Sequence, residues 1–225
     1  AISKSRASDY APIRKLNSSG TDILPRNGFY PPAGDLEVEF GYGPQYGPSS
    51  IVEVALGDNG VFSLVDARRN KIFTYDADGR LLYIFGTTGS SRGAFQSLSS
   101  IAYQGDRLLA LDSITGQITV FQRTAYGDLI DEAIAAYNDK RFAESSELWA
   151  SLADYNNNLD LAYIGLGDAC YRNGEYEEAL EYYQKTVNTA GYSKAFKAMR
   201  KDWISQNFFW ILLVLLAVLV GVIWL

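Results

Sequence analysis

The chain has 225 residues, 48% of them apolar, which is enough to form a packed core, so a largely disordered chain is excluded. A formal net charge of -6 argues against a surface for nucleic acid, which needs clustered lysine and arginine. Histidine is absent, which excludes most familiar hydrolase and metal-site designs, so we expect no enzymatic activity and no cofactor.

The N-terminal part contains a fragment of a repeat that recurs later in the chain. Residues 13–20 parallel residues 72–79, and both stretches begin with isoleucine and end with glycine. We therefore expect segment 1–24 to be the remnant of a preceding repeat. Segment 25–48 is rich in glycine and proline and is expected to be an extended connection. The chain begins without methionine and ends inside an apolar run, so we expect it to be part of a longer protein.

Segment 49–125 alternates short apolar runs with turn dipeptides, which is typical of consecutive antiparallel strands. Two stretches match each other at a fixed offset of 46: residues 61–66 and 70–75 align with residues 107–112 and 116–121. In both copies a strand ends in aspartate and a turn leads to the next strand. The first copy continues through the turn at 76–79 to a last strand at 80–85. Each copy is predicted to be a β-meander.

This pattern resembles the NHL repeats of β-propellers. The resemblance depends on the strand-ending aspartate, on the sequence Asn70, Lys71, Ile72 that enters the next strand, and on the glycine-rich link 85–89. It implies that 49–125 forms two propeller blades of about four strands each. Because closed propellers have roughly four to eight blades, the chain would hold only part of one.

Several acidic residues in these repeats could be taken for a functional site. Asp66 and Asp112 occupy equivalent blade positions, which the blade rotation sets apart, and a strand-end aspartate normally accepts backbone hydrogen bonds in its turn. Asp76 and Asp78 lack the remaining ligands of a calcium loop. We expect structural roles for all four residues and no metal site.

Segment 127–190 changes to a helical period and holds two copies of a helix-turn-helix unit at an offset of 34. Tyr137 aligns with Tyr171, and Trp149 aligns with Tyr183. This spacing resembles the tetratricopeptide repeat (TPR), which implies two α-hairpins whose small residues and aromatic rings pack the paired helices together. The second copy fits the pattern better. Cys170 lies on its first helix, where a small buried side chain is expected.

Tetratricopeptide arrays bind extended segments or helices, so the resemblance implies a protein partner in the groove of the repeats or on the propeller face. A glycan is an alternative ligand. Residues 128–185 hold thirteen acidic and four basic residues, which fits either an acidic groove for a basic partner or a solvated helix exterior. The aromatic residues predicted to contact the partner are Tyr137, Trp149, Tyr163, Tyr171 and Tyr183.

The C-terminal part is predicted to be a capping helix at 193–206 that runs into a transmembrane helix at 207–225. The run that begins at Phe208 and ends at Leu225 has no charged residue, and its rise of about 27 Å approaches the thickness of a hydrocarbon core. A buried core helix is the alternative. The residues predicted to lie at the membrane interface are Trp203, Trp210, Trp224, Lys197, Arg200 and Lys201.

These predictions combine into a multidomain chain, β then α, with a partial β-propeller, TPR-like α-hairpins and a single transmembrane helix. The predicted function is that of a membrane-anchored, non-enzymatic protein-binding scaffold. The alternatives are an accessory subunit of a transporter or envelope assembly complex, and a propeller enzyme whose active site lies in blades outside the chain. The basic residues before the span favour cytoplasmic repeats. Similarity to bacterial surface proteins favours the extracytoplasmic side, which we prefer.

Overall fold

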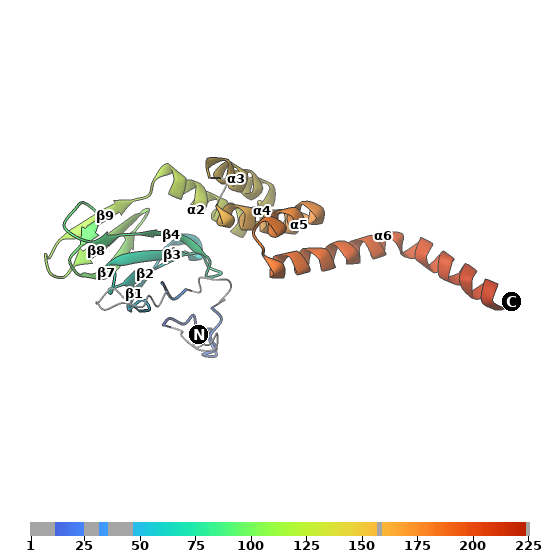
Figure 1. Cartoon of the computed structure of the whole chain (residues 1–225), viewed down its shortest axis with the longest axis horizontal. Helices are drawn as coiled ribbons and strands as arrows, with labels where there is room; N and C mark the ends of the chain where they lie inside the picture. The colour runs from blue at the N-terminus through green and yellow to red at the C-terminus, as the bar shows by residue number, and fades with distance from the viewer. Residues whose placement is uncertain (1–11, 25–31, 36–46, 157–158, 224–225) are drawn as a thin grey trace. The chain divides into compact units, whose positions relative to one another are not determined.

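The computed structural model describes residues 12–24, 32–35, 47–156 and 159–223. Strands come first along the chain and helices follow (Figure 1). The chain divides into two compact units, Ala1–Ile134 and Ala135–Leu225, which we call the β unit and the helical unit. Most of the predicted connection at 25–48 and the first eleven residues of the predicted remnant lie outside the described residues.

The first sheet of the β unit is an antiparallel meander whose four strands lie side by side in chain order. Tight turns join them, and the last turn is built on Asp76, which accepts hydrogen bonds from the backbone N–H groups of Asp78 and Arg80. This confirms the predicted hairpin turn. The strands are β1 (Ile51–Leu56), β2 (Phe62–Asp66), β3 (Lys71–Tyr75) and β4 (Leu81–Phe85).

The second sheet repeats the first but has only three strands in the described part of the chain. Its strands are β7 (Leu98–Gln104), β8 (Arg107–Asp112) and β9 (Ile118–Gln122), and a small parallel pair, β5 (Thr87–Thr88) and β6 (Ala94–Phe95), precedes them. At an offset of 46 a fourth strand would cover 127–131. Those residues lie in helix α2 (Ala125–Asn138) instead. The predicted β-meanders are therefore present, but the sheets are not closed into a propeller.

A shared core joins the two sheets. Val65 and Ile72 of the first sheet are fully buried against apolar side chains of the second sheet and of the link between them, namely Phe95, Leu98, Ile101, Leu108 and Ala110. The opposite face of the first sheet is covered by Ile13 and Leu24 of the N-terminal segment. Alternation of side chains along a strand produces these two apolar faces, so the middle strands β2 and β3 are buried on both sides.

The strand-ending aspartates hold the turns that follow the second strand of each sheet. The Asp66 carboxylate is fully buried and accepts hydrogen bonds from Ser49 Oγ (2.7 Å) and from the backbone N–H groups of Ser50 and Arg68 (both 2.9 Å). Asp112 likewise accepts from the N–H groups of Gln96 (2.7 Å) and Ile114 (2.9 Å). The predicted structural role of both residues is confirmed.

Asn70 links the first sheet to the second. Its side-chain amide donates to the carbonyl oxygen of Phe95 (3.1 Å), and its oxygen accepts from the Leu98 N–H (2.8 Å). Its backbone φ of 54° favours asparagine or glycine. Glycine at position 70 can keep this backbone conformation. We therefore expect Asn70→Gly to lower the free energy of unfolding by about 1–3 kcal/mol, because the Leu98 N–H loses its buried hydrogen-bond acceptor.

Asn59→Gly is the matched control, because Asn59 has the same φ of 54° and is exposed. Hydrogen exchange of peptides over β7 measures both effects. Asn70→Gly should raise exchange there, and Asn59→Gly should change the free energy of unfolding by about 0.5 kcal/mol or less. Equal effects of the two substitutions would contradict the role of Asn70 as a link between sheets.

The helical unit packs its helices in chain order. The most extensive contacts are those of α3 with α4, α4 with α5, and α5 with α6. Gly174 caps the C-terminal end of helix α4. Its φ of 88° lets the N–H of Glu175 donate a hydrogen bond to the Cys170 carbonyl oxygen (2.9 Å). The helices are α3 (Phe142–Tyr155), α4 (Asp160–Asn173), α5 (Tyr176–Lys185) and α6 (Thr189–Ile223).

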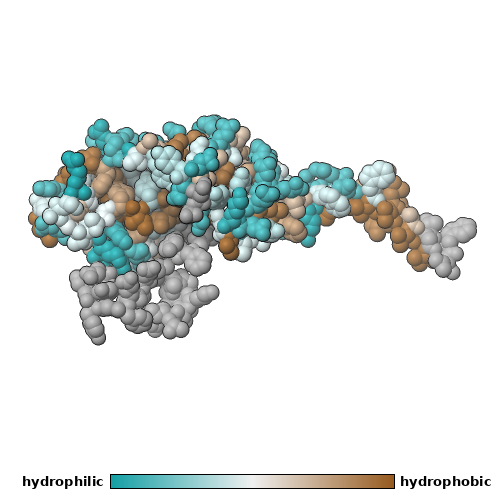
Figure 2. Space-filling view, turned by 45° about the horizontal axis from the view of Figure 1, so that its top comes forward, coloured by the Kyte–Doolittle hydropathy of each residue, from teal (hydrophilic) through white to brown (hydrophobic). Residues whose placement is uncertain are grey.

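Helix α6 contains both the predicted capping helix and most of the predicted span without a break. Its first turns pack against α5, and Ala195 is fully buried with Tyr183. Apolar side chains gather along its C-terminal half (Figure 2). The described part of α6 is long and apolar enough to cross a membrane, and the apolar window of this helix is not buried in the structure.

Candidate functional site: the aromatic surface of the helical unit

Two of the five predicted partner-binding residues are part of the helix packing. Trp149 is 5% exposed, and a Cβ atom at Gly165 would approach its indole ring to 2.4 Å. Tyr183 is 1% exposed, and a Cβ atom at Gly167 or at Gly191 would approach its ring to 2.7 Å. The glycines let the helices approach closely enough for the rings to fill the space between them. Trp149 and Tyr183 therefore stabilise the packing of the helices and do not form part of the surface of the unit.

Tyr163 is partly exposed and forms an aromatic pair with Tyr182 of the neighbouring helix α5. The ring centroids are 6.4 Å apart and the rings are inclined by 28°. Lys185 Nζ lies 5.4 Å from the centroid of Tyr163 and 5.1 Å from that of Tyr182. We call Tyr163, Tyr182 and Lys185 the aromatic cluster. It presents two ring surfaces and one cation at the surface of the helical unit.

Tyr171 and Tyr137 are also partly exposed, and each contacts a neighbouring helix. Lys194 Nζ of α6 lies 4.5 Å from the Tyr171 ring centroid. The Tyr137 hydroxyl accepts a hydrogen bond from Arg172 Nε (3.1 Å). Tyr137, Tyr163 and Tyr171 remain predicted partner contacts, because part of each ring is accessible.

The sequence prediction missed Tyr182 and Lys185. The repeat alignment selects Tyr183 and passes over its neighbour Tyr182. Only one of two neighbouring helical residues can face the core, so Tyr182 could have been expected at the surface. Lys185 lies three residues after Tyr182, which places both on one side of α5. Helical spacing would have grouped these two residues, but the pairing with Tyr163 depends on how α4 and α5 pack.

One group of possible metal ligands lies in this unit among the described residues. The ligand atoms of Cys170, Glu175 and Glu178 are within 4.8 Å of one another. Burial raises the pKa of the Cys170 thiol to about 11, which disfavours the thiolate that a metal requires. Both carboxylates are exposed, and such acidic groups occur commonly without an ion. Cys170 is 2% exposed and fits the predicted structural role.

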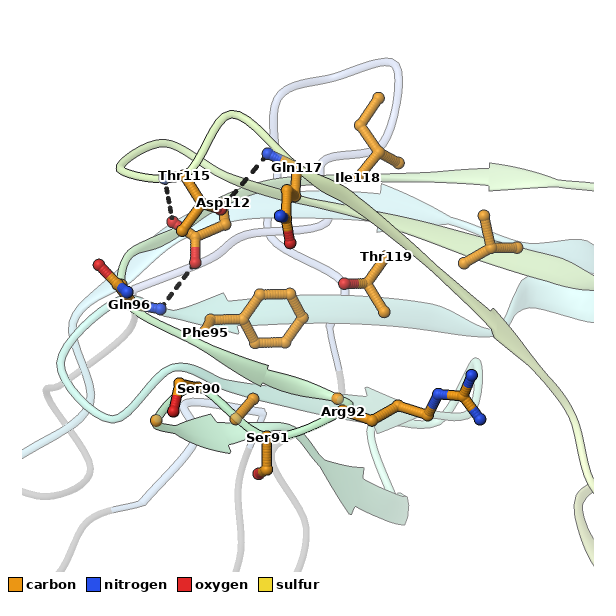
Figure 3. A pocket seen from close by; sticks show the side chains of 14 residues that line it. Ser90, Ser91, Arg92, Phe95, Gln96, Asp112, Thr115, Gln117, Ile118 and Thr119 are labelled. Atoms are coloured by element: carbon orange, nitrogen blue, oxygen red, sulfur yellow. Dashed lines mark hydrogen bonds between the residues drawn. The ribbon is translucent and has the colours of Figure 1, made fainter.

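The β unit has a polar hollow of about 770 Å³ between the link 89–96 and strand β9 (Figure 3). Hydroxyl and amide side chains line much of it, including Ser90, Gln96 and Thr119. Figure 3 shows Asp112 at its edge, where the carboxylate accepts hydrogen bonds from the backbone N–H groups of Gln96 and Thr115. The carboxylate therefore stabilises the turn. A glycan as an alternative ligand stays a prediction.

A second hollow of about 300 Å³ in the β unit is lined mainly by aromatic rings, among them Tyr83, Tyr103 and Phe121. Burial raises the pKa of Tyr83 and of Tyr103, and the Tyr103 hydroxyl lies 2.7 Å from Ser63 Oγ. The Arg123 guanidinium at its rim pairs with Asp128 and Asp131. The Tyr103 hydroxyl and the Arg123 guanidinium thus have polar partners, whereas Asp131 Oδ1 is a buried oxygen without a hydrogen bond in the described part of the chain.

The predicted membrane-interface residues of the described chain lie on α6. Trp203 is 59% exposed and Trp210 is 65% exposed, and a spacing of seven residues puts them on one side of the helix. The basic residues Lys197, Arg200 and Lys201 are exposed about two to three turns before the apolar half begins. Trp224 lies outside the described residues.

Comparison with known protein families finds a match in the helical unit. A tetratricopeptide repeat model matches residues 160–189, which cover α4, α5 and the first residue of α6. This is the second of the two predicted repeats. The chain matches none of the curated proteins with which it was compared. The comparison therefore identifies one tetratricopeptide repeat, and this repeat carries the aromatic cluster.

Proposed function

We propose that the chain is a membrane-anchored, non-enzymatic scaffold that binds a protein partner on the helical unit. The tetratricopeptide match at 160–189 is the observation that carries this proposal, because such repeats generally mediate protein–protein interaction. The exposed rings of the aromatic cluster support it, since partly exposed tyrosines are typical anchors of protein interfaces. The excess of acidic residues over 128–185 favours a partner segment with basic residues.

In this proposal α6 is the anchor. Its apolar half is exposed in the structure, and its first turns are packed on the repeat, so the repeat is held next to the bilayer. The β unit supplies a second surface for partner binding, formed by its two NHL-like blades. We place both units on the extracytoplasmic side, because of the similarity to bacterial surface proteins, although the basic residues of α6 favour the opposite orientation.

Site-specific photocrosslinking in the native membrane tests the binding role. A photoreactive amino acid at Tyr163 should crosslink to a protein partner. The same group at Tyr155, which is 78% exposed and lies at the end of α3, is the matched control. Once the partner is known, Tyr182→Ala should weaken its binding at least about tenfold, because truncation of an aromatic anchor commonly costs more than 1 kcal/mol.

The proposal fails if Tyr163 gives no crosslink, or if Tyr155 gives the same crosslinks as Tyr163. A partner that crosslinks only from positions 212–219 of α6 would favour the accessory-subunit alternative, in which contact is made inside the membrane.

A further inference from the structure

Strand β9 is an open edge of the second sheet in the described part of the chain. It pairs with β8 on one side, and no described strand pairs with it on the other. The equivalent strand of the first sheet is β3, whose outer side pairs with β4. After β9 the chain enters α2 instead of forming such a strand. Among the described residues, the edge of β9 therefore lacks the neighbour that β3 has in β4.

The register shows which backbone groups of β9 point outward. The Asp112 N–H donates to the Gln117 carbonyl oxygen (2.9 Å), and the pairing continues through β9 without a shift. Hydrogen-bonded and non-hydrogen-bonded pairs alternate in an antiparallel ladder, so Ile118, Val120 and Gln122 direct their N–H and C=O groups away from β8. Outward backbone groups of this kind are a template for a further strand.

The polar hollow of about 770 Å³ lies along this edge. Four consecutive residues at 117–120 line it, whereas the lining residue that β8 contributes is Asp112, the last of that strand. The link 89–96 forms the other wall, and Figure 3 shows Phe95 and Thr119 between this link and β9. The hollow is thus on the side of β9 that faces away from β8, which is where an added strand would lie.

The two faces of an added strand would meet different surroundings. Ile118 is 62% exposed and Val120 is 53% exposed, so apolar residues opposite them would bury apolar surface. Thr119 points to the other face of the sheet, where Ser90 and Gln96 of the link line the hollow. The edge therefore fits a strand that alternates apolar with polar residues.

Arg92 gives the polar face of such a strand a charge preference. It is exposed on the link, lines the hollow (Figure 3) and forms no ion pair with another described residue. Asp112 also lines the hollow, but its carboxylate accepts backbone hydrogen bonds. An acidic residue on the added strand would supply the partner of Arg92. A second copy of β9 would not, because β9 contains no acidic residue.

We propose that the edge of β9 binds an extended segment of a partner protein by strand addition, and that this segment alternates apolar with polar residues, at least one of them acidic. The backbone of Ile118, Val120 and Gln122 holds the segment, and Arg92 selects the acidic residue. The inference deepens the proposed scaffold function, on which it rests, by naming what the second surface binds. The Tyr163 crosslink reports on the helical unit alone, whereas peptide binding reports on β9, so the two can fail separately.

Binding of a synthetic heptapeptide to the full chain in lipid nanodiscs tests this proposal. The probe alternates valine with serine, carries glutamate in place of its central serine, and bears a fluorophore so that fluorescence anisotropy reports binding. The matched peptide carries glutamine in place of the glutamate, so it has the same shape without the charge. We expect saturable binding of the glutamate peptide, and about fivefold or more weaker binding of the glutamine peptide.

Substitutions in the chain separate the roles of the backbone and of Arg92. Val120→Pro removes one outward N–H and leaves the hydrogen bonds to β8, because proline is tolerated on strand edges. It should weaken binding of the glutamate peptide about fivefold or more, whereas Val120→Thr, which keeps the N–H, should change it less than about twofold. Arg92→Glu should abolish the preference for glutamate. Arg14→Glu is its matched control, since Arg14 is exposed and does not line the hollow.

Hydrogen exchange over β7 and β8 shows whether each variant keeps the sheet folded. Absence of saturable binding of the glutamate peptide, or equal affinity of the two peptides, would overturn the proposal. So would a preference for glutamate that survives Arg92→Glu. A dimer of the full chain that Val120→Pro abolishes would also overturn it, because the occupant would then be a second copy. If Val120→Pro unfolds the sheet, the two peptides and Arg92→Glu still decide the outcome.

Discussion

Replacement of Asp66 by alanine is expected to lower the free energy of unfolding of the β unit by about 3–5 kcal/mol, because it removes one partner of a buried ion pair. The Asp66 carboxylate is fully buried and lies 3.1 Å from Arg69 Nη1. It also accepts from two backbone N–H groups and one hydroxyl. Alanine would leave all four donors without this acceptor.

Hydrogen exchange over 47–70 in the full chain measures this loss locally. Asp78→Ala is the control, since its carboxylate is 61% exposed and pairs with Arg80 at the surface, where such pairs contribute at most about 1 kcal/mol. Asp112→Ala should have an intermediate effect, because Asp112 accepts backbone hydrogen bonds, but the residue at the position of Arg69 is the uncharged Thr115. An Asp66→Ala chain that exchanges like the Asp78→Ala chain would refute this role.

Gly165→Ala is expected to destabilise the helical unit by about 1–3 kcal/mol, the usual cost of overpacking a tight core. The new Cβ atom would meet three atoms of the Trp149 ring at 2.4 to 2.7 Å. Trp149 is buried and cannot move into solvent without loss of its own packing. Thermal unfolding together with hydrogen exchange of α4 reports the change.

Gly127→Ala in α2 is the matched control for Gly165→Ala. At Gly127 the nearest atom, Arg123 Cβ, would be 3.6 Å from the new Cβ, which is an ordinary contact. The better helix propensity of alanine should then raise stability by up to about 1 kcal/mol. Trp149→Leu should reduce the cost of Gly165→Ala in the double variant. Additive effects would show that the ring and the glycine are not in contact.

The strands were largely predictable from the sequence, because alternation and turn residues are local signals. The predicted strands at 61–66, 70–75, 107–112 and 116–121 agree with β2, β3, β8 and β9 within two residues. Strands β1 and β7 were not aligned with each other. Their sequences share little, since β1 alternates exposed and partly buried residues while β7 mixes serines with apolar residues. Their common role follows from pairing with β2 and β8.

The candidate site was predicted only in part. Sequence spacing identified the aromatic positions of the repeat, but it did not separate rings that face inward from rings at the surface. Trp149 and Tyr183 are buried because glycines of neighbouring helices lie opposite them. The surface cluster of Tyr163, Tyr182 and Lys185 forms between two helices. Such contacts depend on how the helices pack, which a single-sequence pattern does not specify.

Extraction of membranes with alkaline carbonate tests the central claim, a protein-binding unit anchored by α6. We predict that the full chain stays with the membrane, and that Leu213→Arg with Leu216→Arg releases it, because each arginine near the centre of a span costs about 2.5–3.5 kcal/mol. Both leucines are exposed on α6, and the corresponding double alanine variant should stay membrane-bound. Release of the unsubstituted chain, or retention of the double arginine variant, would contradict the account.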